Sequence, residues 1–167
     1  MQVIGIFALV ASLIFVGLQM RQTQAIAIAN QYQDRAAISL EARFAVLQNN
    51  TLLELRGMDL LAQLADESIR EAFEKKYGAT ASLGIGYGYT VTKVTYLMMD
   101  NNHFQYQSGF LAEDTWHAYR TELKGYLTDR YFRYVWDGTR HQYRTDFQTV
   151  VDELIIENSN ESRASAR

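Results

Sequence analysis

Asp100 and His103 are the residues whose types and spacing come closest to a catalytic or metal-binding pair. In a helix they stand at positions i and i+3, so the carboxylate and the imidazole share one face. Such a carboxylate can orient a histidine that acts as a general base, and both groups are ligands for divalent metals. Tyr106 follows at the same spacing and completes a candidate site for ligand sensing or hydrolysis. Polar faces of this kind are also common at the ends of ordinary helices, and we favour that interpretation.

The composition argues against most other chemistry. The chain of 167 residues has no cysteine, which excludes thiol nucleophiles, disulfides and thiolate metal sites. The spacing supplies no third ligand beside Asp100 and His103, so we expect no bound metal and no cofactor. The net charge of -3 predicts that the protein does not bind nucleic acid. Gly84 and Gly86 are not followed by the Gly-Lys-Ser/Thr ending of a phosphate-binding loop. The composition therefore favours a protein without enzymatic activity.

The N-terminal segment predicts a membrane anchor. Residues 1–20 contain no charged side chain, and twenty helical residues span about 30 Å, the thickness of the hydrocarbon core. A cleaved signal peptide would need a positive segment before the apolar run, and a soluble core helix would show a polar stripe; neither is present. Arg21 then indicates, by the positive-inside rule, that the rest of the chain is cytoplasmic. We expect a single-pass protein of the inner membrane with a retained signal anchor.

Two strips of small residues predict close helix packing. Small residues at i, i+3 and i+7 allow two membrane helices to approach closely, and the anchor has this pattern at Gly5, Ala8 and Ser12. A second strip recurs every four residues further along the chain, at Thr80, Gly84, Gly88 and Thr92. We predict that these strips contact a protein partner or a second copy of the chain. A β-hairpin remains an alternative for residues 78–96, because Thr, Val and Tyr favour strands.

The remaining elements are predicted to be helical. Proline is absent from the chain, which permits long uninterrupted helices. Residues 21–47 contain no helix breaker and predict a juxtamembrane helix that continues the anchor. Residues 51–156 carry apolar side chains at helical spacing and predict a helical domain, whereas residues 157–167 lack large apolar side chains and predict a disordered tail. The fold class is therefore all-α: a transmembrane helix that continues into a bundle of about five helices.

Polar residues on the predicted helices suggest where contacts form. Gln105, Tyr106 and Gln107 have side chains that can hydrogen-bond across a helix interface. Five arginines lie in the C-terminal third among aromatic residues: Arg120, Arg130, Arg133, Arg140 and Arg144. They predict either a face for anionic lipid headgroups or, as we favour, a solvated face paired with Asp129, Asp137 and Asp146.

Three segments resemble a known group of proteins. They are "ASLIFVGLQMRQTQ", "FQYQSGFLAEDTWHAY" and "VWDGTRHQYRTDFQTVVD". They resemble blocks of a large group of short, uncharacterised bacterial single-span membrane proteins, in which an apolar helix ends in a Leu-x-x-Gln-x-Arg-Gln-like boundary. The resemblance implies an anchor followed by a helical domain, and it carries no functional residue. The sequence departs from the group between Gly78 and Gly88, where the group has an ordinary amphipathic helix.

Together these features predict a membrane-tethered helical interaction or accessory protein. Its expected partners are the lipid bilayer and either another protein or a second copy of the chain. The alternative is a membrane-anchored ligand-sensing or hydrolytic domain that uses Asp100 and His103.

Overall fold

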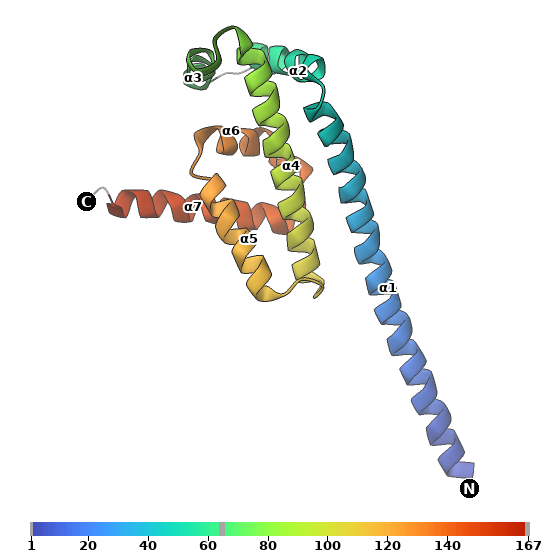
Figure 1. Cartoon of the computed structure of the whole chain (residues 1–167). Helices are drawn as coiled ribbons and strands as arrows, with labels where there is room; N and C mark the ends of the chain where they lie inside the picture. The colour runs from blue at the N-terminus through green and yellow to red at the C-terminus, as the bar shows by residue number, and fades with distance from the viewer. Residues whose placement is uncertain (1, 64–65, 166–167) are drawn as a thin grey trace.

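A computed structural model describes residues 2–63 and 66–165, and over this range the chain is helical, with no strand. Figure 1 shows one long helix lying beside a group of shorter ones, with α4 in the centre. The α-helices are α1 (Gln2–Leu47), α2 (Asn50–Gln63), α3 (Glu67–Tyr77), α4 (Ala81–Gln107), α5 (Glu113–Tyr126), α6 (Arg130–Thr139) and α7 (Thr145–Ser165). The all-α prediction is confirmed, and the described part of the chain has seven α-helices. The helix interpretation of residues 78–96 is also confirmed, because α4 occupies the segment for which a hairpin was the alternative.

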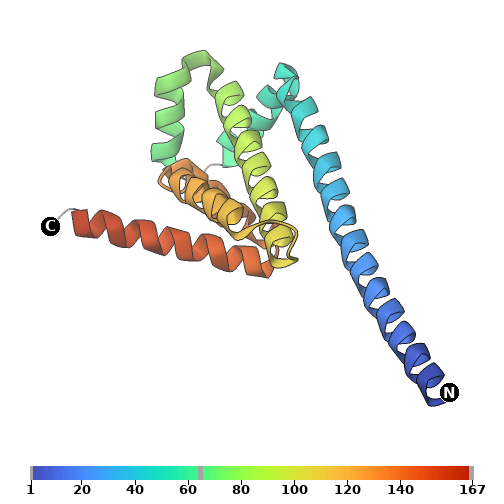
Figure 2. The same ribbon diagram turned by 60° about the horizontal axis from the view of Figure 1, so that its bottom comes forward.

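Helix α1 is a single helix of 46 residues. Its C-terminal half packs against α4 through two small residues, Ala29 and Ala36, which are buried and lie two turns apart. Gln105 Nε2 donates a hydrogen bond of 3.3 Å to the carbonyl oxygen of Ala29, as its predicted interface role requires. The Tyr32 and Phe104 rings stack beside this bond with centroids 4.0 Å apart. The N-terminal half of α1 continues past the end of α4 without a neighbour in Figures 1 and 2.

The membrane-spanning character predicted for residues 1–20 is not found in the described structure. Among the residues that are described, no helix combines the length and the apolarity needed to cross a membrane. Of the small-residue strip predicted in this segment, Ser12 is exposed. Gly5 and Ala8 lie outside the residues whose side-chain surroundings are described.

Helices α2 and α4 meet backbone to backbone. A Cβ atom on Gly57 would lie 1.6 Å from the carbonyl oxygen of Ser82, and one on Gly86 would lie 2.0 Å from that of Leu53. Both distances are shorter than a carbon–oxygen contact, so neither position has room for a side chain. The residue that permits the close approach on α4 is therefore Gly86, which belongs to neither predicted strip.

The four residues of the second predicted strip differ in their burial within the chain. Thr80 is exposed, Gly84 and Gly88 are half-buried, and Thr92 is buried. The reason is geometric: residues four apart advance about 400° around the helix axis, so the strip turns by about 40° at each step. Over three steps it winds away from any single neighbour.

The C-terminal half of α4 packs into an aromatic core with α5, α6 and α7. Trp136, Tyr96 and Phe147 are fully buried, and the Tyr96 and Trp136 rings lie 5.0 Å apart. The polar ends of the rings are satisfied: Tyr96 Oη donates to the carbonyl of Phe132 at 2.9 Å, and Trp136 Nε1 donates to Asp152 Oδ1 at 3.0 Å. Large rings with paired polar atoms fill this core without leaving an unsatisfied donor on either ring.

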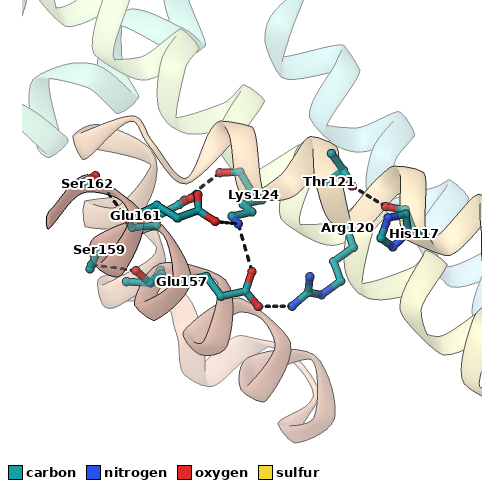
Figure 3. A network of polar contacts seen from close by, with 10 residues as sticks. His117, Arg120, Thr121, Lys124, Glu157, Ser159, Glu161 and Ser162 are labelled. Carbon is teal, nitrogen blue, oxygen red and sulfur yellow. Dashed lines mark hydrogen bonds and ion pairs between the residues drawn. The ribbon is translucent and has the colours of Figure 1, made fainter. Parts of the chain in front are cut away.

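Helix α7 continues through Ser165, so residues 157–165 are helical rather than disordered. Glu157 and Glu161 lie one turn apart on α7 and face Arg120 and Lys124, which lie one turn apart on α5 (Figure 3). Arg120 contacts Glu157 at 2.5 Å, and Lys124 contacts Glu161 at 2.6 Å. The sequence prediction failed here because it counted apolar residues, whereas charge pairs support this end of the helix.

Candidate functional site

Asp100, the predicted carboxylate of the candidate site, is engaged with an arginine. Its Oδ1 accepts a hydrogen bond of 3.1 Å from Arg144 Nε, and its carbonyl oxygen accepts one of 2.5 Å from the same guanidinium. Burial raises the pKa of Asp100, and the charge of Arg144 opposes that rise. This carboxylate therefore fixes the segment between α6 and α7 against α4.

His103 is buried among aromatic side chains of the core. Its side chain is buried, with its ring 4.9 Å from that of Trp116 and 6.1 Å from that of Phe147. Nδ1 has no hydrogen-bond partner among the described residues. Burial, reinforced by the nearby charge of Arg144, lowers the pKa of His103 to about 4. The imidazole is therefore neutral at physiological pH and packs as an aromatic ring.

Tyr106, the third predicted residue, stacks on Trp116, with the two ring centroids 5.8 Å apart. The three predicted residues thus lie on successive turns of α4, where Asp100 engages Arg144 while His103 and Tyr106 both pack against Trp116. No group of three or more His, Cys, Asp or Glu side chains among the described residues is arranged to hold a metal ion. The geometry gives the trio a packing role and supplies no acid–base pair.

The arginines of the C-terminal third are paired, although with other residues than predicted. Arg120 binds Glu157, Arg130 binds Asp66, Arg140 binds Asp152, and Arg144 binds Asp100. Arg133 donates to the carbonyl of Leu127 at 2.7 Å. The partners differ because they come from other helices, whereas Asp129, a predicted partner, instead caps the N-terminus of α6. The paired carboxylates neutralise most of the positive charge that a lipid-binding face would need.

A cavity of about 450 Å³ lies between α2, α4 and α6. Tyr89, Tyr131 and Tyr134 line it, and Tyr131 Oη donates a hydrogen bond of 3.2 Å to the carbonyl of Ile85. Burial raises the pKa of Tyr131, so its hydroxyl stays protonated at neutral pH. Sequence reasoning did not single out this cavity. Besides these rings, its lining includes the carboxylate of Asp137, the amide of Gln63 and the hydroxyl of Thr139.

The N-terminal half of α1 presents large apolar side chains to solvent. The exposed residues are Ile6, Phe7, Leu9, Val10, Leu13, Ile14, Phe15, Val16, Leu18 and Met20. Because successive helical residues are rotated by about 100°, these side chains cover most of the helix circumference, and the remaining sector contains Ser12 and Gln19. This surface differs from the single apolar stripe that a helix presents to one neighbouring helix.

Comparison with known proteins assigns the chain to no family: no family model, curated protein or solved structure matches it. The resemblance carried by the three sequence segments therefore stays a prediction. The geometry itself provides a projecting apolar helix at one end and a packed helical domain at the other.

Proposed function

We propose that the protein is a membrane-tethered helical accessory protein. The N-terminal half of α1 inserts into the lipid bilayer, and the helices from Ala29 onward form a domain that binds a protein partner or a second copy of the chain. The observation that carries the proposal is the exposed apolar surface between Ile6 and Met20, which covers most of the helix circumference. A helix that is apolar over most of its circumference suits a hydrocarbon environment better than contact with one partner.

The direction in which α1 projects supports the division into a membrane-inserted half of this helix and a separate helical domain. Its apolar half projects away from the rest of the molecule in both ribbon views, so lipid can surround it without displacing another helix (Figure 2). The first basic side chain, Arg21, follows directly after the apolar half, and Arg35 lies further along. The excess of positive charge on this side favours a cytoplasmic domain at the inner membrane.

Fractionation of the full-length protein tests the tether. We expect the protein to stay with membranes after alkaline carbonate washing, and the double variant Leu13→Asp/Phe15→Asp to move to the soluble fraction. Each aspartate in the middle of a membrane helix costs about 2.5–3.5 kcal/mol. The matched control is Ile38→Asp, because Ile38 is also an exposed apolar residue of α1 but lies in the half that packs on α4. Release of the unmodified protein by carbonate, or equal release of both variants, would contradict the tether.

The interaction role is tested separately in detergent. We expect the solubilised protein to be recovered as an oligomer or with a stoichiometric partner in affinity purification and light scattering. Ala8→Leu and Ser12→Leu should weaken a contact between two copies if it forms through the small-residue strip. A monodisperse monomer without a partner would contradict the accessory role but not the membrane tether.

A further inference from the structure

Two arginines from different helices line one cavity, and a buried lysine of a third helix lies behind its wall. Arg43 comes from the C-terminal end of α1, Arg56 from α2 and Lys93 from α4. The cavity between these helices has a volume of about 290 Å³. It is lined by Arg43, Val46, Leu52, Arg56, Tyr89 and Thr90. Lys93 lies one turn beyond Tyr89 and therefore on the same face of α4.

Lys93 is almost completely buried, with 3% of its surface exposed. Its Nζ donates a hydrogen bond of 2.7 Å to Gln142 Oε1 and lies 4.5 Å from the centroid of the Tyr143 ring. Both partners are uncharged. Burial, together with the positive charges of Arg43 and Arg56, lowers the pKa of Lys93 to about 8. A buried ammonium group in such surroundings lacks the anion that normally accompanies one.

The two arginines also lack an anionic partner. The guanidinium of Arg56 lies over the Tyr89 ring, 5.0 Å from its centroid. Among the described residues no carboxylate lies within ion-pair distance of Arg43, Arg56 or Lys93. Four of the five arginines in the C-terminal third, by contrast, bind a carboxylate. The described part of the chain therefore places positive charge around one cavity without a carboxylate to balance it.

We propose that this cavity binds a soluble dianion of the phosphate monoester class. The two guanidinium groups that line the cavity suit the geometry and charge of a phosphate, and the buried charge of Lys93 adds to the positive field there. Tyr89, Val46 and Leu52 supply an apolar wall against which the organic part of such an ester packs.

The position of the cavity along α1 favours a soluble ligand over a lipid headgroup. Arg43 lies 23 residues after Met20, the last residue of the exposed apolar stretch, which corresponds to about 35 Å of helix. A headgroup of the bilayer that holds this stretch does not reach the cavity. This choice of source depends on the proposed tether, whereas the match between the cavity and phosphate does not.

Thermal unfolding of the full-length protein in a phosphate-free, non-ionic detergent tests the proposal. Inorganic phosphate and phenyl phosphate are the probes, and sodium chloride keeps the ionic strength constant. We expect each probe at saturation to raise Tm by about 4 °C or more, because a ligand that binds only the folded state stabilises it. Arg43→Gln and Arg56→Gln should each lower the apparent affinity by about tenfold or more. The matched control, Arg70→Gln, removes the same charge from the surface of α3 and should keep the full shift.

Lys93→Met separates ligand binding from folding. Methionine keeps much of the buried volume and removes the charge, so we expect a Tm without phosphate no lower than that of the parent, and no shift on adding either probe. Absence of a shift in the parent protein, or an equal shift in Arg56→Gln and Arg70→Gln, would overturn the proposal. A shift produced by micelles containing phosphatidic acid but by neither soluble probe would overturn the soluble source. None of these variants alters the apolar half of α1, so membrane fractionation reports on the tether independently.

Discussion

The two halves of α4 are packed in opposite ways. In the N-terminal half, Gly86 and the facing Gly57 bring the backbones of α2 and α4 into contact, and no side chain lies between them. In the C-terminal half, the rings of Tyr96, Trp136 and Phe147 fill the space among four helices. Helix α4 thus combines a backbone contact that depends on the absence of side chains with an aromatic contact that depends on the largest side chains. The first contact should tolerate no added atom, and the second should tolerate no removed ring.

The aromatic core should show the largest response to mutation. Trp136→Ala removes a fully buried indole and leaves Asp152 without the hydrogen bond from Nε1. We expect a loss of about 3–5 kcal/mol in the free energy of unfolding, measured by urea denaturation. Trp136→Phe, which keeps a ring, should lose less. Equal losses for the two variants would show that the volume of a ring at this position is not what stabilises this half.

Acid should weaken the same half through His103. The pKa of this histidine is about 4 in the folded protein and ordinarily about 6.5. As the pH falls below 6.5, His103 becomes protonated in the unfolded chain but stays neutral in the folded protein. The free energy of unfolding should therefore fall between pH 6.5 and about 4 and then level off. The total change corresponds to about 3 kcal/mol.

His103→Phe provides the comparison for this titration, because phenylalanine can pack between Trp116 and Phe147 without binding a proton. Urea denaturation of both proteins across this pH range isolates the contribution of His103 from those of the carboxylates. Parallel curves for the two proteins would mean that the imidazole is not held neutral by its surroundings.

The glycine contact should respond to a single added methyl group. Gly86→Ala places a Cβ against the carbonyl of Leu53, and we expect a loss of about 1–3 kcal/mol because the two backbones must separate. Gly125→Ala is the matched control, because an added Cβ on this α5 residue meets nothing within 4 Å. It should be neutral or stabilising by about 0.5–1 kcal/mol. Hydrogen exchange should show faster opening of α2 in Gly86→Ala, with the aromatic core unaffected.

The charge pairs between α5 and α7 should show the smallest effect. Glu157→Gln removes the partner of Arg120 and one partner of Lys124, all partly exposed. We expect a change of about 0–1 kcal/mol in global stability. Circular dichroism and hydrogen exchange should detect fraying of α7 beyond Glu157, and an unchanged exchange rate there would indicate that the pairs do not support this end of the helix.

The sequence predicts the features of this fold that are encoded locally. The absence of proline and the unbroken helical spacing predict that residues 2–47 form one helix, and the polar side chain of Gln105 predicts its bond across the interface. The Gly57–Gly86 contact could not be predicted in the same way, because it joins two helices whose register is set by tertiary packing. The disordered tail was mispredicted for a related reason, since Glu157 finds its partners on another helix.

The same limit applies to the candidate sites. Asp100 and His103 lie three positions apart, so the sequence brings them to notice. In the fold, however, Asp100 binds Arg144 and His103 packs against Trp116. Arg43, Arg56 and Lys93 lie on three helices and share no motif, so only the folded chain brings them together. The absence of a nearby carboxylate, which makes this cluster distinctive, is likewise a property of the tertiary structure.

The hydrogen bond from Gln105 to Ala29 fixes the height of the helical domain above the membrane in the proposed arrangement. Ala29 lies nine residues after Met20, which corresponds to about 14 Å along α1. Because α4 runs antiparallel to α1 (Figure 1), the turn between α4 and α5 is the part of the domain closest to the lipid surface. This turn carries Phe110, an exposed aromatic residue. In the proposed arrangement the domain therefore stands at a set distance and orientation, with the turn that carries Phe110 facing the lipid surface.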